Sequence, residues 1–318
     1  MRVVELPEPS LRAAWATVEV ESVVVHRWDP APTRRSAVLG GPFAGRIVAV
    51  GPVEPLDPSF AAPVPSPGGT ELPAMGSRVV GVAREGSCAE YVSVPRSTLS
   101  VLHDDHVGCD AAAQSAISGL RASLAHEALA ARGVRSVIVL GASGPTGCIV
   151  GGLAARAGWR AIAVTSRPGV IAGLESCGFA NVLAAGSADD AATFQRYLEQ
   201  LPAVAVVDCT DGEYLTRLGQ ASRGPASTVR ATVVAFTGRR RSASAATPTT
   251  EVLIDVVRAS LVDPVGIARQ YREIAVLLGT GVLRLPTTVT GLDDLPAYCA
   301  GSRAHRLGAL VVHPRRAA

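Results

Sequence analysis

Apolar residues follow two different patterns along the chain, and the change falls close to residue 110. Before that point, short runs rich in β-branched residues alternate with glycines, which is typical of a small β-barrel. Strands are predicted at 16–25, as a glycine-rich pair within 38–51, and within 76–95. The proline-rich stretch 52–75 has few apolar residues and is predicted to be an exposed loop.

From residue 111 onward, helical segments alternate with short apolar runs. Helices are predicted at 111–131, 148–158 and 266–279, and strands at 136–140, 161–164, 180–183, 203–207, 228–236 and 307–313. Such alternation predicts a parallel, doubly wound sheet. The fold class is therefore α/β, with an all-β part and a doubly wound part. The small and polar segment 242–250 is predicted to be a loop.

The segment 137–147 reads V-I-V-L-G-A-S-G-P-T-G and contains the strongest chemical signal in the chain. Its apolar run is typical of a strand buried on both faces of a parallel sheet. Evenly spaced glycines follow, and a helical segment comes next. A strand, a glycine turn and a helix together form the site at which a dinucleotide diphosphate binds. We therefore predict nucleotide binding by Gly141, Ser143, Gly144, Pro145, Thr146 and Gly147.

The end of the next strand indicates which dinucleotide binds. An NAD site usually has an acidic residue about twenty positions past the glycines, where it accepts hydrogen bonds from the ribose. Here the corresponding positions hold Ser166 and Arg167, whose hydroxyl and guanidinium groups suit the 2′-phosphate of NADP. The alternative interpretation is that Arg167 only caps a surface turn. Cys209 and Thr210 end a later strand and are predicted to line the same cofactor site.

Composition excludes several classes of function. A net charge of +3 is too small to indicate nucleic-acid binding, and all basic residues other than histidine are arginines, which is typical of a GC-rich bacterial genome. The six cysteines contain no C-x-x-C pair, so a reduced, cytoplasmic chain without a structural zinc is expected. The N-terminus has no secretory signal, and glycines and arginines interrupt the apolar stretch 134–164, so no membrane span is expected.

Several segments, in this order along the chain, resemble the medium-chain dehydrogenase/reductase superfamily in its zinc-independent branch of quinone oxidoreductase-like and enoyl reductase-like proteins. They are L-G-G-P-F-A-G-R-I-V-A-V-G (39–51), G-S-R-V-V-G-V (76–82), C-A-E-Y-V-S-V-P (88–95), G-A-S-G-P-T-G (141–147), G-F-A-N-V (178–182) and L-G-A-L-V-V (307–312). The resemblance implies a GroES-like β-barrel catalytic domain formed by 1–112 and 268–318. It further implies a Rossmann nucleotide-binding domain at 113–267, with the active site between the two domains. The resemblance also implies that the chain forms a homodimer or homotetramer.

The resemblance also assigns catalytic positions, at which this chain departs from the family. In V-V-V-H-R-W-D (23–29), His26 and Asp29 stand where zinc-free members carry Asn and Asp. Arg121 replaces the Thr that holds the nicotinamide amide. Phe236 and Thr237 are predicted to bind the cofactor, because they end the strand near which the nicotinamide and the substrate meet in the family. The zinc ligands of the metal-dependent branch are missing, so no metal is expected.

Each of these assignments has a structural alternative. His26 is able to donate a proton near neutral pH, or it is a strand histidine bonded to a carbonyl. Arg121 either binds the carboxamide or polarises a carbonyl, or else it forms a structural salt bridge. Asp29 is expected to fix the loop in which Asp29 itself lies. The segment 103–106 with Cys109 is read as solvated rather than as a metal cluster. The arginines at 239–241 either recognise an anionic substrate or lie in a solvated loop.

These observations predict an NADPH-dependent reductase of an activated C=C bond (enone, quinone or enoyl) or C=O bond in a small apolar substrate. Two alternatives stay open. The first is a pathway-specific enzyme that uses the same cleft for another reaction, and the second is a nucleotide-binding regulatory protein without catalysis.

Overall fold

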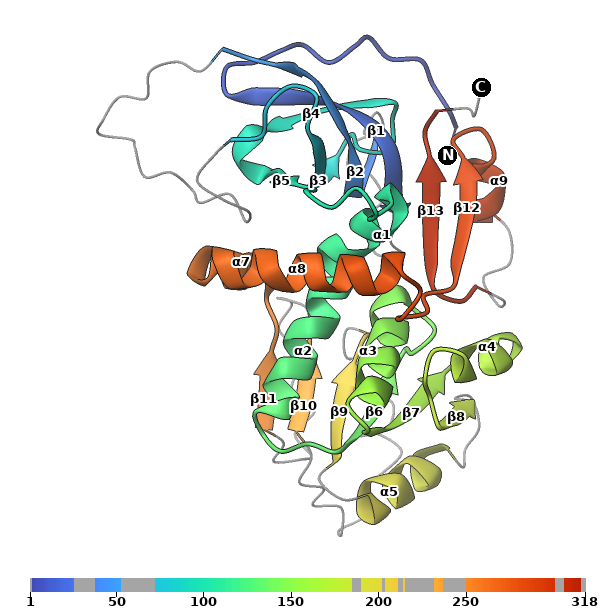
Figure 1. The fold of residues 1–318 in the computed structure, drawn as a ribbon. Helices are drawn as coiled ribbons and strands as arrows, with labels where there is room; N and C mark the ends of the chain where they lie inside the picture. Colours follow the sequence, from blue (N-terminus) through green and yellow to red (C-terminus); the bar gives the residue numbers. More distant parts are fainter. Residues whose placement is uncertain are drawn as a thin grey trace.

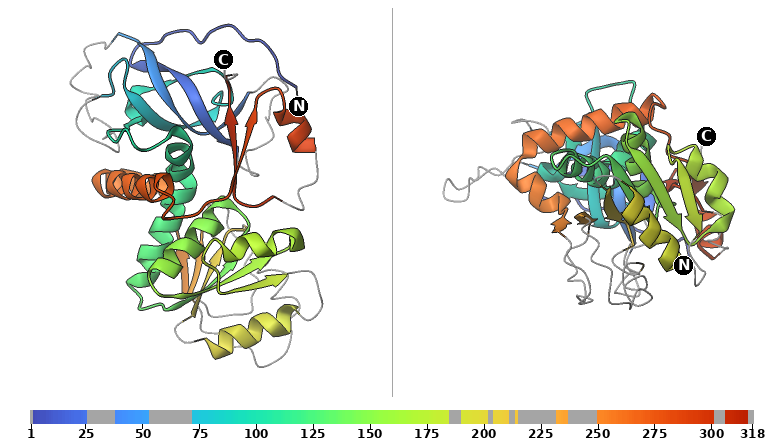
Figure 2. Two further views of the ribbon diagram at one scale, coloured as in Figure 1. Left: turned by 45° about the vertical axis from the view of Figure 1, so that its right-hand side comes forward. Right: turned by 90° about the horizontal axis from the view of Figure 1, so that it is seen from below.

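The computed structural model describes residues 2–25, 38–52, 72–184, 190–201, 204–210, 214, 232–236, 250–300 and 306–315 of the chain. Figure 1 shows two sheets at opposite ends of the molecule, with helices between and beside them. The sheet at the top of Figure 1 (the upper sheet) has seven strands, and the sheet at the bottom (the lower sheet) has six. Figure 2 shows the same arrangement from two further directions.

The upper sheet joins the two ends of the sequence. Its order is β12-β13-β1-β2-β3-β5, and β4 pairs with β1 away from this path. The strands are β1 (Trp15–Val25), β2 (Leu39–Val50), β3 (Arg78–Glu85), β4 (Tyr91–Pro95), β5 (Ser100–Val101), β12 (Thr287–Gly291) and β13 (Ala309–His313). Strand β13 runs antiparallel to β1, with Val311 opposite Val24, so residues far apart in the sequence share one apolar core.

The predicted pair of strands at 38–51 is wrong, because β2 is one continuous strand of 12 residues. The glycines that suggest a turn instead allow close approach of a neighbouring strand. A Cβ atom on Gly45 would lie 2.0 Å from the carbonyl oxygen of Glu19 in β1. The pairing of β1 with β2 shifts register between Val20 and Ser22, next to this contact. A glycine inside a strand here indicates a bulge rather than a turn.

The lower sheet is parallel throughout, with the order β11-β10-β9-β6-β7-β8. Its strands are β6 (Ser136–Leu140), β7 (Arg160–Thr165), β8 (Asn181–Ala184), β9 (Val204–Asp208), β10 (Thr232–Ala235) and β11 (Thr250–Leu253). The order reverses between β6 and β9, so the carboxyl ends of these two strands flank the crevice where ligands bind in such sheets. Helices cover both faces, because Val139 packs on the α2–α3 side and Ile138 on the α5 side.

The helix predicted at 111–131 is divided into three segments. These are α1 (Cys109–Gln114), a π-helical turn (Ser115–Gly119) and α2 (Leu120–Ala130). The long helix α8 (Pro264–Gly279) crosses this region, as Figure 1 shows. A Cβ atom on Gly119 would lie 2.6 Å from Cγ2 of Ile274, so the glycine lets α8 pack closely.

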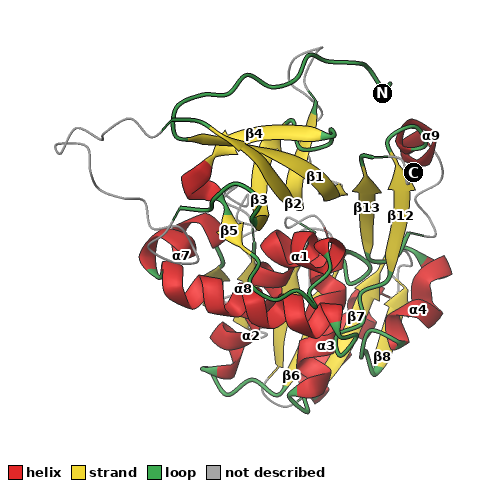
Figure 3. Ribbon diagram, turned by 45° about the horizontal axis from the view of Figure 1, so that its top comes forward, coloured by secondary structure: helices red, strands yellow, loops and turns green. Residues whose placement is uncertain are grey.

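The remaining helices are short. They are α3 (Pro145–Arg156), α4 (Ile171–Glu175), α5 (Asp190–Gln200), α7 (Val256–Val262), α9 (Leu295–Ala300) and the 3₁₀ turns at Arg96–Thr98 and Pro168–Val170. Figure 3 shows α9 beside the β12–β13 pair. None of the helices in the described part of the chain has the length and apolar character that crossing a membrane requires.

Several elements do not appear in the sequence prediction, namely β5, β11, β12, α4, α5, α7 and α9. The loop predicted at 242–250 is wrong at Thr250, which begins β11 and pairs with Thr232. Strand β11 lies at the edge of the sheet and contacts one neighbouring strand, so its four residues need no long apolar run. The predicted domain boundaries at 112 and 267 stay a prediction, and α8 continues across the second of them.

Candidate functional site

A cleft of about 2720 Å³ lies between the upper and lower sheets. This volume is several times that of a typical small-molecule pocket, so the cleft has room for two ligands together. Among the predicted residues, the following line it: Arg121, Gly141, Ser143, Gly144, Pro145, Thr146, Gly147, Ser166, Arg167, Cys209, Thr210 and Phe236. His26, Asp29, Thr237 and the arginines at 239–241 lie outside the described residues.

The three glycines of the loop after β6 have different surroundings. Gly141 has a φ angle of +71°, and a Cβ atom there would lie 2.7 Å from Cγ2 of Thr210. A Cβ atom on Gly147 would lie 2.7 Å from Cα of Ala142. For Gly144 the nearest atom would be 3.6 Å away, so this position is open toward the cleft. The first and third glycines therefore permit packing, and the second leaves space beside the backbone for a ligand.

The start of α3 provides hydrogen-bond donors at the same place. Gly144 is the residue before the helix and has no side-chain cap, and Pro145 occupies the first helical position. The backbone N–H groups of Thr146 and Gly147 belong to the first turn, where a helix offers them no carbonyl partner. The first turn carries no acidic residue. This helix end therefore suits an anion such as a diphosphate.

The Arg167 side chain is oriented by a residue of the distant C-terminal part. Its Nη1 atom donates to the carbonyl oxygen of Arg306 at 2.7 Å, and its backbone N–H donates to Oγ1 of Thr165 at 3.1 Å. A guanidinium has five N–H donors, so one bond to a carbonyl orients the group and is compatible with phosphate binding. Ser166 lines the cleft beside it.

The segment 306–308, just before β13, contacts both of the elements that are predicted to bind the cofactor. The Arg306 carbonyl accepts from Arg167, and the Gly308 N–H donates to the carbonyl oxygen of Ser143 at 2.9 Å. The Arg306 guanidinium lies 4.1 Å from the centre of the Tyr298 ring and donates to the carbonyl of Tyr298. Sequence reasoning missed the contacts with Arg167 and Ser143, because they join residues more than a hundred positions apart.

A buried carboxylate shapes the turn after β9. Asp208 is 2% exposed, and its Oδ1 accepts from the backbone N–H of Thr210 at 2.7 Å and from its hydroxyl at 2.6 Å. These bonds hold the Thr210 methyl group against Gly141. Asp208 itself lines the cleft at the carboxyl end of its strand. The predicted residues Cys209 and Thr210 therefore stand directly beside the glycine loop.

The segment 103–106 folds as a local turn outside this cleft. Oδ1 of Asp104 accepts from the backbone N–H of His106 at 2.8 Å, and Asp105 lies 3.6 Å from Nη1 of Arg78. The Cys109 thiol donates to Oε2 of Glu21 at 3.1 Å. Burial, with a smaller contribution from Glu21, raises the pKa of Cys109 to about 11. Within the described ranges, no group of three or more His, Cys, Asp or Glu residues is placed to hold a metal ion.

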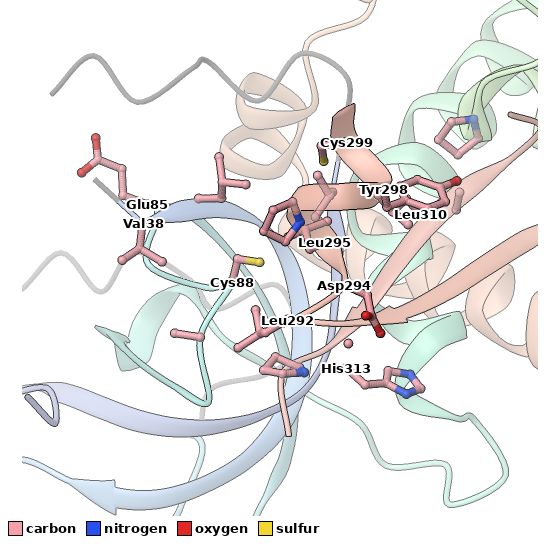
Figure 4. Close-up of a pocket in the computed structure, with 18 of the residues that line it drawn as sticks. Val38, Glu85, Cys88, Leu292, Asp294, Leu295, Tyr298, Cys299, Leu310 and His313 are labelled. Carbon is pink, nitrogen blue, oxygen red and sulfur yellow. The ribbon is translucent and has the colours of Figure 1, made fainter. Parts of the chain in front are cut away.

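The upper-sheet side of the cleft is mainly apolar, and sequence reasoning missed its residues. Figure 4 shows Val38 and Cys88 facing a space that Leu295, Cys299 and Leu310 border from the other side. Val38 directly precedes β2, Cys88 lies in the turn between β3 and β4, and the others belong to α9 and β13. A wall assembled from four separate elements gives no continuous motif in the sequence.

Comparisons with known proteins agree with this architecture. No family model matches the chain, and no curated protein matches it significantly. A mycobacterial protein solved in complex with NADPH is 20% identical, with a TM-score of 0.72 over 98% of this chain and 94% of that one. The Escherichia coli quinone oxidoreductase complexed with NADPH is 16% identical, with a TM-score of 0.72 over 98% and 95%. The CurK enoyl reductase is 17% identical, with a TM-score of 0.67 over 97% and 93%.

Matches of this kind establish the fold. The predicted α/β class, with a GroES-like β-barrel part and a Rossmann doubly wound parallel sheet, is confirmed. The resemblance to medium-chain quinone oxidoreductases and enoyl reductases is confirmed at the level of the fold.

Proposed function

We propose that this chain, which has the fold of these quinone oxidoreductases and enoyl reductases, is an NADPH-dependent reductase of an activated C=C or C=O bond in a small apolar substrate. The observation that carries the proposal is the convergence of an open glycine loop, a helix start and Arg167 on one cleft whose opposite wall is apolar. Two proteins of this fold were solved with NADPH, which supports the cofactor assignment. A cytoplasmic location and a homodimer or homotetramer are parts of the proposal.

The residues present fit this cofactor. The space beside Gly144 is the one that a Cβ atom would fill, and the first turn of α3 presents N–H groups without a competing carboxylate. We assign the diphosphate to Gly144, Thr146 and Gly147 and the 2′-phosphate to Ser166 and Arg167. Bound NADPH supplies a hydride. Thr210 and Phe236 then line the site at the strand ends, and Phe236, 7% exposed, presents an apolar surface.

Reduction also requires stabilisation of negative charge on oxygen and delivery of a proton. Arg121 lies on α2 and lines the cleft, and its guanidinium is charged at every physiological pH. We propose that it polarises the carbonyl or holds the carboxamide of the cofactor. We further propose that His26 donates the proton and that Asp29 fixes its loop. Spectroscopic assay of NADPH oxidation with a panel of quinones and enones tests the activity, and tight NADPH binding without any oxidation would contradict it.

The cofactor assignment is tested by Arg167→Asp. The dissociation constant for NADPH should rise about 30-fold, because a hydrogen bond to a charged group contributes about 2 kcal/mol. Affinity for NADH, which lacks the 2′-phosphate, should change little. Arg156→Asp is the matched control, since Arg156 is an exposed residue of α3 outside the cleft. Titration of both variants with both nucleotides gives the result, and an unchanged NADPH-to-NADH ratio would refute the assignment.

A further inference from the structure

Two of the six cysteines lie together in the core of the lower sheet, outside the machinery that the proposed function uses. Cys148 closes the first turn of α3 and is fully buried, and Cys177 lies in the turn after α4 and is 2% exposed. The two thiols are within hydrogen-bonding reach of each other. They are therefore a dithiol pair rather than two separate core residues.

Two glycines of α3 allow the turn that carries Cys177 to approach the helix. Gly151 and Gly152 stand three and four positions after Cys148, which places all three residues on one face of α3. A Cβ atom on Gly151 would lie 3.0 Å from the carbonyl oxygen of Cys177, and one on Gly152 would lie 3.8 Å from it. Cys177 is thus held by backbone packing against the face of α3 that also carries Cys148.

The two thiols differ in acidity. The Cys148 thiol lowers the pKa of Cys177, burial acts in the opposite direction, and the Ser176 hydroxyl adds to the lowering. The hydrogen bond with Cys177, together with burial, raises the pKa of Cys148. Because the thiolate is the nucleophilic form of cysteine, Cys177 is suited to attack an oxidant, and Cys148 stays protonated beside it.

Cys177 lies just below the surface of the protein. Its neighbours in the turn are Ser176, which is exposed, and Gly178, which is half-buried. Cys148 also has the carbonyl oxygen of Ala142 at 3.4 Å from its sulfur, on the side of the glycine loop. A small oxidant therefore reaches the pair from the Cys177 side.

We propose that Cys148 and Cys177 form a reversible intramolecular disulfide when the protein meets a hydroperoxide. The Cys177 sulfur attacks one peroxide oxygen, the O–O bond breaks, and the products are a sulfenic acid and an alcohol, or water in the case of hydrogen peroxide. The Cys148 sulfur then attacks the sulfenic sulfur, the S–S bond forms, and the hydroxyl leaves as water with the Cys148 proton. The two thiols lose two electrons, which the hydroperoxide accepts.

The disulfide has a consequence for stability. It closes a loop that contains most of α3, all of β7 and α4, and the predicted 2′-phosphate residues Ser166 and Arg167. Closing a loop restricts the unfolded chain. Because the two thiols already meet in the native fold, the oxidised protein should unfold at a higher temperature than the reduced one. Oxidation of a single core cysteine would have the opposite effect, since it places a polar group among apolar residues.

Peptide mapping of the whole protein tests the disulfide. After a small excess of hydrogen peroxide, alkylation in denaturant and digestion with trypsin, peptide 136–156 should be joined to peptide 161–196, which carry Cys148 and Cys177 as their only cysteines. Dithiothreitol should separate the two peptides again. A bridge from 136–156 to 197–217, which carries the neighbouring Cys209, would overturn the proposal, as would the absence of any bridge.

Three variants test the roles of the two thiols. In Cys148→Ser the bridge should be absent, and dimedone should trap a sulfenic acid on Cys177. In Cys177→Ser the bridge should also be absent, and dimedone should label Cys148 little. Cys88→Ser is the matched control, because Cys88 is another buried cysteine but lies in the core of the upper sheet, and this variant should still form the bridge. Preferential labelling of Cys148 over Cys177 would overturn the assigned roles.

Thermal denaturation gives a readout that does not depend on the peptides. Peroxide should raise the thermal midpoint by about 5 °C in the wild-type protein and in Cys88→Ser, and should not raise it in the other two variants. A lower midpoint in the oxidised wild-type protein would show that the bridge distorts the fold and would overturn the proposal. These results do not depend on any activity with NADPH, so they stand or fall separately from the proposed function.

Discussion

Replacing Gly308 with alanine is expected to lower the free energy of unfolding by about 4 kcal/mol and the thermal midpoint by roughly 10 °C. Gly308 has a φ angle of +78°, and a Cβ atom would lie 1.8 Å from the carbonyl oxygen of Pro286. The alanine variant thus combines a disfavoured backbone conformation with a contact that only a backbone shift relieves. Thermal denaturation monitored by circular dichroism measures the change.

Gly281→Ala separates these two causes. Gly281 has a φ angle of +73°, but no atom lies within 4 Å of the position of its Cβ. This control should lose only about 1 kcal/mol, the cost of the left-handed conformation. The Gly308 variant should also bind NADPH more weakly, because its N–H bonds the carbonyl of Ser143. Equal losses of stability in both variants would show that the approach to Pro286 is not what requires glycine.

Gly144→Ala is expected to weaken NADPH binding roughly a thousandfold while the thermal midpoint of the free protein stays unchanged. The added methyl group has no clash within the protein, since its nearest atom would be 3.6 Å away, but it occupies the cleft in front of the helix start. A diphosphate displaced by it would lose about two charge-assisted hydrogen bonds, about 4 kcal/mol together. Isothermal titration calorimetry measures the affinity.

Gly147→Ala should affect mainly the thermal midpoint of the free protein rather than its affinity for NADPH. Its Cβ atom would lie 2.7 Å from Cα of Ala142, so the variant should lose thermal stability before any ligand is added. The pair therefore distinguishes a glycine needed for ligand approach from one needed for packing. Wild-type affinity in Gly144→Ala would mean that the diphosphate does not lie at this loop.

The parts of the fold that the sequence predicts well are those determined by local pattern. Strands β6 and β7 are buried on both faces, so they read as uninterrupted apolar runs. The glycine loop is equally local, because strand, turn and helix follow one another. The sequence also contains a signal for helix α5, because Phe194 and Tyr197 are three positions apart, as on one face of a helix, and pack on the same cluster.

Other parts depend on contacts that no local pattern encodes. Strand β12 reads T-T-V-T-G with its first three residues exposed, and it is a strand because it pairs with β13. The contacts of Arg306 and Gly308 with Arg167 and Ser143 join distant segments. The apolar side of the cleft is formed by residues from separate elements, among them Val38, Cys299 and Leu310. In the sequence they look like ordinary core residues, and only the fold shows that they also line the cleft.

The bonds from residues 306 and 308 to Arg167 and Ser143 limit how the two sheets move relative to each other. If the two sheets move apart while these bonds remain, the motion has to be a hinge rotation whose axis passes near residues 306–308. The residues proposed to bind the phosphates then stay close to the axis, while the parts of the upper sheet farthest from it move through the largest arc. A nucleotide would therefore bind to residues that move little, and the movement of the upper sheet would enclose the substrate.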